Sequence, residues 1–228
     1  MSIIFALALL LAGRQSRPKN DEPLISATKP DYLGCSVWTS KGWSDPTSRS
    51  VRTPVLRSSM GFRAFAEVKA VFKDGLCKNT TILYVASAPG NQYIVVYQKS
   101  PGETSGNGIR LIGWSPRGDK LLAQVSLWDH DSDSGYGHLA LVFVTSTNSA
   151  REARSLNDAL GLLFGPDCEF ELEITGWKTS QQILVKVSRT PMTSEHEQHF
   201  CVKKPRKFVY DLQKETVEAT HTTLPDVR

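Results

Sequence analysis

The chain has 228 residues, of which 40% are hydrophobic and 22% charged, and its formal net charge is +4 at pH 7. This composition is that of an ordinary globular protein and excludes an intrinsically disordered chain. The charge is small for the length, and the one dense basic run is Lys203-Lys204-Pro205-Arg206-Lys207. Nucleic-acid-binding proteins usually gather basic residues and stacking aromatics on one face, so we expect no nucleic-acid partner.

The N-terminus carries an unbroken apolar run, Ile3 to Ala12. The run is about half as long as a membrane-spanning helix, and it matches the apolar region of a secretory signal peptide. We therefore expect residues 1–13 to be a signal peptide and residues 14–30 a flexible lead-in. The mature protein is then periplasmic or secreted, with no transmembrane segment. Basic residues follow the run and none precedes it, so a buried N-terminal strand is the alternative.

The chain contains four cysteines, Cys35, Cys77, Cys168 and Cys201. None of them has the close spacing of a zinc site, and in an oxidising compartment an even number is used for disulfides. We therefore expect two disulfides, which agrees with export. The most local pairing joins Cys35 to Cys77 and Cys168 to Cys201, but the sequence leaves all three pairings open.

Residues 31–54 mix aromatic and turn residues irregularly, which predicts irregular structure with one short strand near 35–38. After that the chain alternates apolar and β-branched segments with turn residues, a pattern typical of antiparallel strands. The expected strands are Arg63–Phe72, Thr81–Ser87, Tyr93–Gln98, Ile109–Gly113, Lys120–Trp128 and His138–Thr145.

One helix interrupts the strands, near residues 155–164. Ser155 and Asp158 resemble a capping box, and Gly165-Pro166 ends the apolar helical pattern. A second meander follows, with expected strands at Glu169–Thr175, Ile183–Ser188, His199–Lys203, Phe208–Asp211 and Val217–Ala219.

Three stretches of the chain resemble one another. They read RSSMGFRAFAEVKA from Arg57, WSPRGDKLLAQVSL from Trp114 and WKTSQQILVKVS from Trp177. Self-similarity of this kind is typical of repeated β modules. We therefore expect residues 31–228 to form a single all-β domain with three repeat-like units, at about 55–105, 109–150 and 168–220.

The segment Gly113 to Ala123 (GWSPRGDKLLA) resembles the repeat of TolB-type β-propellers, whose blades carry a Ser-Pro-Asp-Gly turn before an apolar strand. The resemblance covers about one blade, and Arg117 stands where that family has Asp. It implies antiparallel blade-like sheets in a partial or irregular propeller-like domain, because three units are too few to close a ring. Self-association could complete it, and a β-sandwich is the alternative fold. A propeller-like fold implies no particular function.

The loop after the fifth predicted strand contains alternating acidic residues, Asp129, Asp131 and Asp133. Carboxylates in this arrangement can bind calcium, which prefers six to eight oxygen ligands. The loop does not follow the EF-hand pattern, so a solvated hairpin loop is the alternative. We expect no other cofactor.

The chain has no Gly-x-Ser-x-Gly, P-loop or His-Glu-x-x-His motif, so no catalytic residue is assigned. Trp38 and Trp43 are candidates for a binding surface. The sequence therefore favours an exported, non-catalytic binding or scaffold protein of the periplasm or cell envelope, with an envelope protein or glycan as partner. The alternative is an exported hydrolase that acts on envelope polysaccharide through carboxylates such as Asp129.

Overall fold

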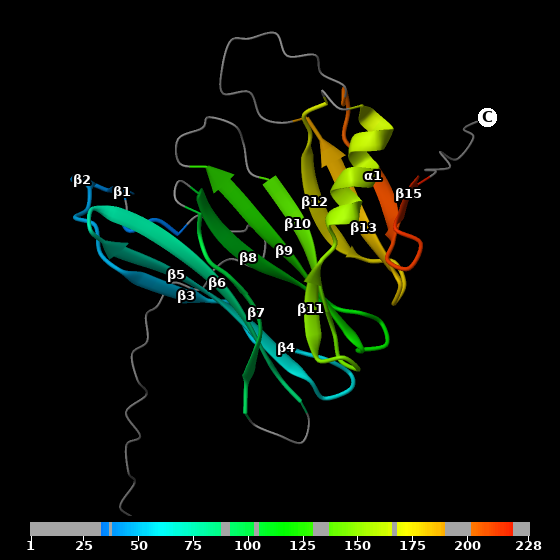
Figure 1. Ribbon diagram of the computed structural model, residues 1–228, viewed down its shortest axis with the longest axis horizontal. Helices are drawn as coiled ribbons and strands as arrows, with labels where there is room; N and C mark the ends of the chain where they lie inside the picture. The colour runs from blue at the N-terminus through cyan, green and yellow to red at the C-terminus, as the bar shows by residue number, and fades with distance from the viewer. Residues whose placement is uncertain are drawn as a thin grey trace, which may run out of the picture.

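The structure is a computed structural model that describes residues 33–36, 38–87, 92–102, 105–129, 137–165, 168–189 and 202–220. The described chain forms a small hairpin, three larger antiparallel sheets and one helix (Figure 1). This confirms the all-β fold with antiparallel sheets and a single short helix. The predicted signal peptide and lead-in, residues 1–13 and 14–30, lie outside the described residues.

The hairpin contains β1 (Trp38–Thr39) and β2 (Gly42–Trp43). Sheet 1 contains β3 (Arg49–Arg52), β4 (Leu56–Arg57), β5 (Arg63–Lys73), β6 (Leu76–Ala86) and β7 (Ile94–Lys99). Sheet 2 contains β8 (Ser105–Trp114), β9 (Lys120–Asp129), β10 (Gly137–Val144) and β11 (Ser149–Glu152). Sheet 3 contains β12 (Glu171–Trp177), β13 (Gln182–Ser188), β14 (Arg206–Asp211) and β15 (Thr216–Ala219). Sheets 2 and 3 are meanders in which neighbouring strands follow one another along the chain, whereas in sheet 1 both β3 and β4 pair with β5.

The three mutually similar stretches of sequence lie at corresponding places, because they lead into β5, β9 and β13. In the first two, a glycine with positive φ ends the turn, Gly61 at +83° and Gly118 at +76°. The N–H of Gly61 donates to the Ser58 carbonyl at 3.1 Å, and that of Gly118 to the Ser115 carbonyl at 2.8 Å. A residue with a Cβ is strained in this left-handed conformation, which favours glycine at both positions.

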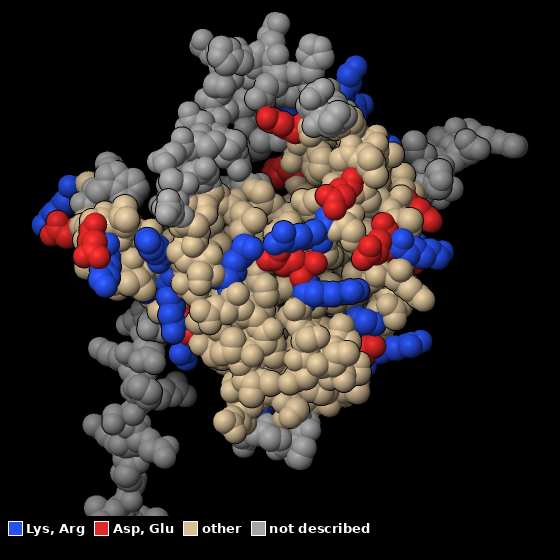
Figure 2. All heavy atoms as spheres, in the orientation of Figure 1, with Lys and Arg blue, Asp and Glu red and all other residues tan. Residues whose placement is uncertain are grey.

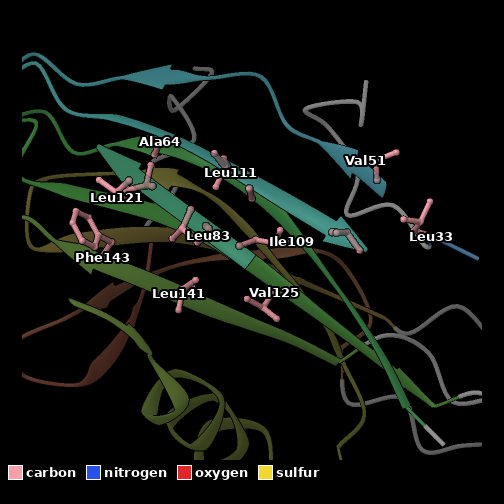
Figure 3. Packing of buried hydrophobic residues seen from close by; sticks show 14 of the residues in the cluster. Leu33, Val51, Ala64, Leu83, Ile109, Leu111, Leu121, Val125, Leu141 and Phe143 are labelled. Carbon is pink, nitrogen blue, oxygen red and sulfur yellow. The ribbon is translucent and has the colours of Figure 1, made fainter. Parts of the chain in front are cut away.

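Sheets 1 and 2 pack face to face over one hydrophobic core (Figure 3). On β5 the core positions are occupied mainly by alanines, including Ala64, Ala66 and Ala70, each fully buried. Small side chains on one sheet leave room for larger ones on the other, here Leu121, Leu141 and Phe143 of sheet 2. The alternation along β5 determines which residues face the core, because successive side chains point to opposite sides of a strand.

Sheet 2 uses its other face to pack against sheet 3 and the helix α1 (Arg154–Phe164). Leu156 and Leu160 of the helix are fully buried in this second core. The Phe164 ring lies 5.7 Å from the Phe208 ring of β14, edge to face. The helix therefore lies on the inner side of sheet 3, as Figure 1 shows.

Two details of the predicted elements are wrong. The helix begins after Ala153 without a side-chain cap, and the Ser155 hydroxyl instead pairs with the Tyr210 hydroxyl at 2.6 Å. Within the expected strand His199–Lys203, the described residues Val202 and Lys203 are not in a strand. The short strands β3, β4 and β11 were not expected from the sequence.

The disulfide between Cys35 and Cys77 attaches the segment before β1 to β6, with an S–S distance of 2.03 Å. Cys168 is also disulfide-bonded, and Cys201 lies outside the described residues. The first half of the local pairing is therefore confirmed.

Candidate functional site

A hollow of about 560 Å³ opens where β7, β8 and β9 come together. Its size is within the range of ligand-binding cavities in proteins, about 300 to 1,000 Å³. It is lined by Lys99, Ser100, Pro101, Gly102, Ser105, Gly106, Asn107, Leu127 and Trp128. Apolar groups with a few polar ones are the usual lining of a small-molecule site.

Trp128 forms the apolar wall of the hollow together with Leu127 and Pro101. It is the partner of Gly106 in the ladder between β8 and β9. A Cβ at position 106 would overlap the Trp128 indole, so the ring lies directly on the β8 backbone. Glycine at this position is what allows the indole to lie flat against the strand.

Asn107 also borders the hollow, but its side chain is 1% exposed and lies on the face of β8 opposite to the Trp128 indole. Its Nδ2 donates to the Asn79 carbonyl of sheet 1 at 3.1 Å, whereas its Oδ1 has no hydrogen-bond partner. Asn79 donates to the Leu33 carbonyl, and both Asn79 Oδ1 and Thr81 Oγ1 are buried without partners. These polar groups are therefore buried between sheets 1 and 2 and are not exposed to the hollow.

The rim of the hollow is held by polar contacts across two sheets. The Lys99 ammonium of sheet 1 donates to Glu152 Oε1 of β11 at 2.8 Å, and the Tyr97 hydroxyl donates to the same oxygen at 2.7 Å. Burial alone would raise the pKa of Glu152, but the hydrogen bonds from Lys99, Tyr97 and Arg154 hold it below its usual range. Glu152 therefore stays ionised and fixes the Lys99 side chain at the rim.

The described residues that line the hollow include no carboxylate, histidine or cysteine. Glycoside hydrolysis usually needs two carboxyl groups facing each other across the scissile bond. The described wall offers an apolar surface and two hydroxyls.

The sequence-predicted site residues lie partly around this hollow. Asp129 is the last residue of β9, next to Trp128, whereas Asp131 and Asp133 lie outside the described residues. Within the described part of the chain, no group of three or more His, Cys, Asp or Glu side chains could hold a metal ion. Trp38 and Trp43 are partners in the β1–β2 ladder.

Gly106 and Asn107 were not found from the sequence. The one available signal is the Ser-Gly-Asn-Gly run before an apolar segment, because glycine inside a strand often marks a close approach of another group. The partner of that approach, Trp128, is far away in the sequence and becomes evident only from the β8–β9 register.

The described residues form an all-β protein of three successive antiparallel sheets, with a hollow of small-molecule size where β7, β8 and β9 come together. Comparison of the chain with protein-family models, with curated proteins and with solved structures gave no match. Among the described residues, no helix is long and apolar enough to cross a membrane.

Proposed function

We propose that this chain is an exported, non-catalytic binding protein of the periplasm or cell envelope, and that its ligand is a saccharide held in the Trp128 hollow. The observation that carries the proposal is the presence of the Trp128 indole in a hollow of about 560 Å³ that Ser100 and Ser105 also line. A sugar ring offers both an apolar C–H face and hydroxyl donors. The Trp128 indole would contact the C–H face, and the Ser100 and Ser105 hydroxyls would bind hydroxyl groups of the sugar.

Export is supported by the apolar N-terminus and by the Cys35–Cys77 disulfide, because disulfides persist mainly in oxidising compartments. The intact mass of protein purified from its native host, with and without reduction and alkylation, tests this part. We expect loss of about the first dozen residues and two disulfides. A full-length chain with free thiols would place the protein in the cytoplasm.

The ligand is tested by calorimetric titration with a panel of soluble neutral and N-acetylated saccharides. Ser105→Ala removes a hydroxyl from the lining of the hollow and should weaken binding about tenfold, because one lost hydrogen bond is worth about 1.4 kcal/mol. Gly106→Ala displaces the indole and should abolish binding. Thr175→Ala, at an exposed position on β12, is the control and should bind as the wild type does.

The proposal of a saccharide ligand fails if no member of the panel binds, or if binding is the same in Gly106→Ala and Ser105→Ala as in the control. Release of reducing sugar ends from a polysaccharide would instead favour the hydrolase.

A further inference from the structure

Sheets 1 and 3 each have one face that packs in a core and one that does not. The described elements that pack against sheet 1 belong to sheet 2, and α1 packs on the inner side of sheet 3. We call the remaining faces the outer face of sheet 1 and the outer face of sheet 3. Sheet 2 is covered on both sides by the two cores.

The outer face of sheet 1 is basic. The strand register places one set of charged residues on this face: Arg52, Arg57, Arg63, Glu67, Lys69, Lys73 and Lys78. All of them except Glu67 are cationic. Figure 2 shows Lys and Arg side chains in a line over the strands of sheet 1, at the left of the view.

Glu67 offsets one of the six cations, so the outer face of sheet 1 keeps an excess of five positive charges. Its side chain is 5% exposed, and it accepts a hydrogen bond from Ser50 at 2.7 Å. It also pairs with Arg52 at 3.4 Å and Lys69 at 3.5 Å. Partial burial alone would raise the pKa of Glu67, but the Ser50 hydrogen bond and the two cations hold it below its usual range.

The aromatic rings on this face are occupied by neighbours within the sheet. Phe65 and Tyr84 stack with centroids 4.7 Å apart, the Arg52 guanidinium lies 5.4 Å from the Phe65 centroid, and Arg63 lies 5.5 Å from that of Tyr93. Because these ring faces are already covered, they are poorly placed to stack on nucleic-acid bases. Exposed apolar side chains remain beside the cations, including Val71 and Val95, which are 46% and 52% exposed.

The outer face of sheet 3 has the opposite balance. Its register places these charged residues outward: Glu171, Glu173, Lys186, Lys207, Asp211 and Glu218. Carboxylates outnumber ammonium groups, and Lys186 is already paired with Glu173 at 3.1 Å. Leu184 is partly exposed in the middle of this face.

We infer that the basic outer face of sheet 1 docks on the acidic outer face of sheet 3 of a second copy of this chain. The contact continues the face-to-face stacking of sheets from one molecule into the next. Opposite charges on the two faces favour this head-to-tail arrangement and disfavour pairing of two like faces. A head-to-tail contact closes into a ring or extends into a chain, depending on the rotation between copies.

Sedimentation velocity of the full mature chain tests the inference at two salt concentrations. The wild type should form dimers or larger assemblies at low ionic strength. It should dissociate in about 1 M salt, where the screening length falls to about 3 Å.

Charge-reversal variants test the two outer faces independently. One variant combines Arg57→Glu, Lys73→Glu and Lys78→Glu on sheet 1, and the other combines Glu171→Lys with Glu218→Lys on sheet 3. Each variant carries two outer faces of the same sign and should be monomeric by itself. An equal mixture should assemble again, because each reversed face then meets its complement on the other variant.

Arg117→Glu, in the exposed turn between β8 and β9, is the control and should assemble as the wild type does. Circular dichroism checks that every variant is folded. A wild type that stays monomeric at low salt overturns the inference, as do assemblies that persist in both charge-reversal variants. A mixture that fails to reassemble also overturns it.

Discussion

The two interfaces of sheet 2 show two different ways of packing one antiparallel sheet on another. Toward sheet 1 the contact consists mainly of aliphatic side chains and alanines. Toward sheet 3, buried polar side chains bind the backbone of the edge strand β12. Gln124 Oε1 accepts from the Ile174 N–H at 2.9 Å, Arg110 donates to the Ile174 carbonyl at 3.2 Å, and His138 Nδ1 binds the Leu172 carbonyl.

This difference follows from what each sheet presents. Sheet 1 offers a flat face of side chains, whereas sheet 3 approaches with β12, the first strand of the sheet. The backbone groups on the free side of an edge strand need hydrogen-bond partners when they are buried. Arg110, Gln124 and His138 provide them. The second interface therefore depends on a few specific groups, and the first depends on the fit of many small ones.

The largest expected effect is on the polar interface. Gln124→Leu leaves both the Ile174 N–H and the Arg110 guanidinium without their shared acceptor. We expect the free energy of unfolding to fall by about 4 kcal/mol, because a buried charge and a buried donor lose a partner together. Urea denaturation measures it. Gln98→Leu, at an exposed position on β7, is the control, and equal effects in the two variants would contradict the role given to Gln124.

The second largest effect is expected from removal of the Cys35–Cys77 disulfide, at the end of the interface between sheets 1 and 2. Replacement of both Cys35 and Cys77 by Ala removes a link between residues 42 apart in sequence. The expected loss is about 3 kcal/mol, since the unfolded chain gains the freedom that the link removed. Thermal unfolding with and without reductant measures it. A loss below about 1 kcal/mol would mean that the core alone holds this segment.

The alanine face should tolerate no added volume. Ala66→Leu inserts a larger side chain where Ala66 is fully buried between two sheets. We expect a loss of about 2 kcal/mol from overpacking. The same change at Ala219, which is exposed on β15, should have little effect. If the two variants are equally stable in denaturant, the sheets are not in close contact at Ala66.

The smallest expected effect is a pH dependence of stability that comes from His138, at the interface between sheets 2 and 3. Burial lowers the pKa of His138, although its hydrogen bond to the Leu172 carbonyl and the nearby Glu171 oppose this in part. The unfolded chain therefore binds the proton first as the pH falls below about 6.5, and stability decreases by at most about 1.4 kcal/mol per pH unit. The contribution is fully present above that pH and is lost toward the lower folded pKa. In His138→Gln the free energy of unfolding, measured by urea denaturation, should change less between pH 5 and 6.5 than in the wild type. An unchanged slope would contradict the role given to His138.

The alternation of apolar and polar residues predicted individual strands in sheets 1 and 3, but it did not predict how the sheets contact one another. The alternating apolar residues of Arg63–Phe72 and Ile183–Ser188 predict strands, and the structure has β5 and β13 there. Strand β11 was missed because Ser149–Glu152 is short and polar. It forms by pairing with β10, and its Glu152 binds Tyr97 and Lys99 of sheet 1.

Long-range contacts explain the other differences. Ser155 was expected to cap the helix, but its partner is Tyr210, 55 residues away in the sequence. The Trp128 hollow likewise depends on the register between β8 and β9. A sequence shows which residues can form a site, but it does not show which distant residue will lie beside them.

The most direct test of the proposed function is a map of backbone and side-chain N–H chemical shifts during titration with the saccharide that binds. The account predicts the largest shifts at the Trp128 indole N–H and the Ser105 backbone N–H, with small changes on the outer faces of sheets 1 and 3. Shifts confined to other parts of the molecule, with Trp128 and Ser105 unchanged, would contradict it.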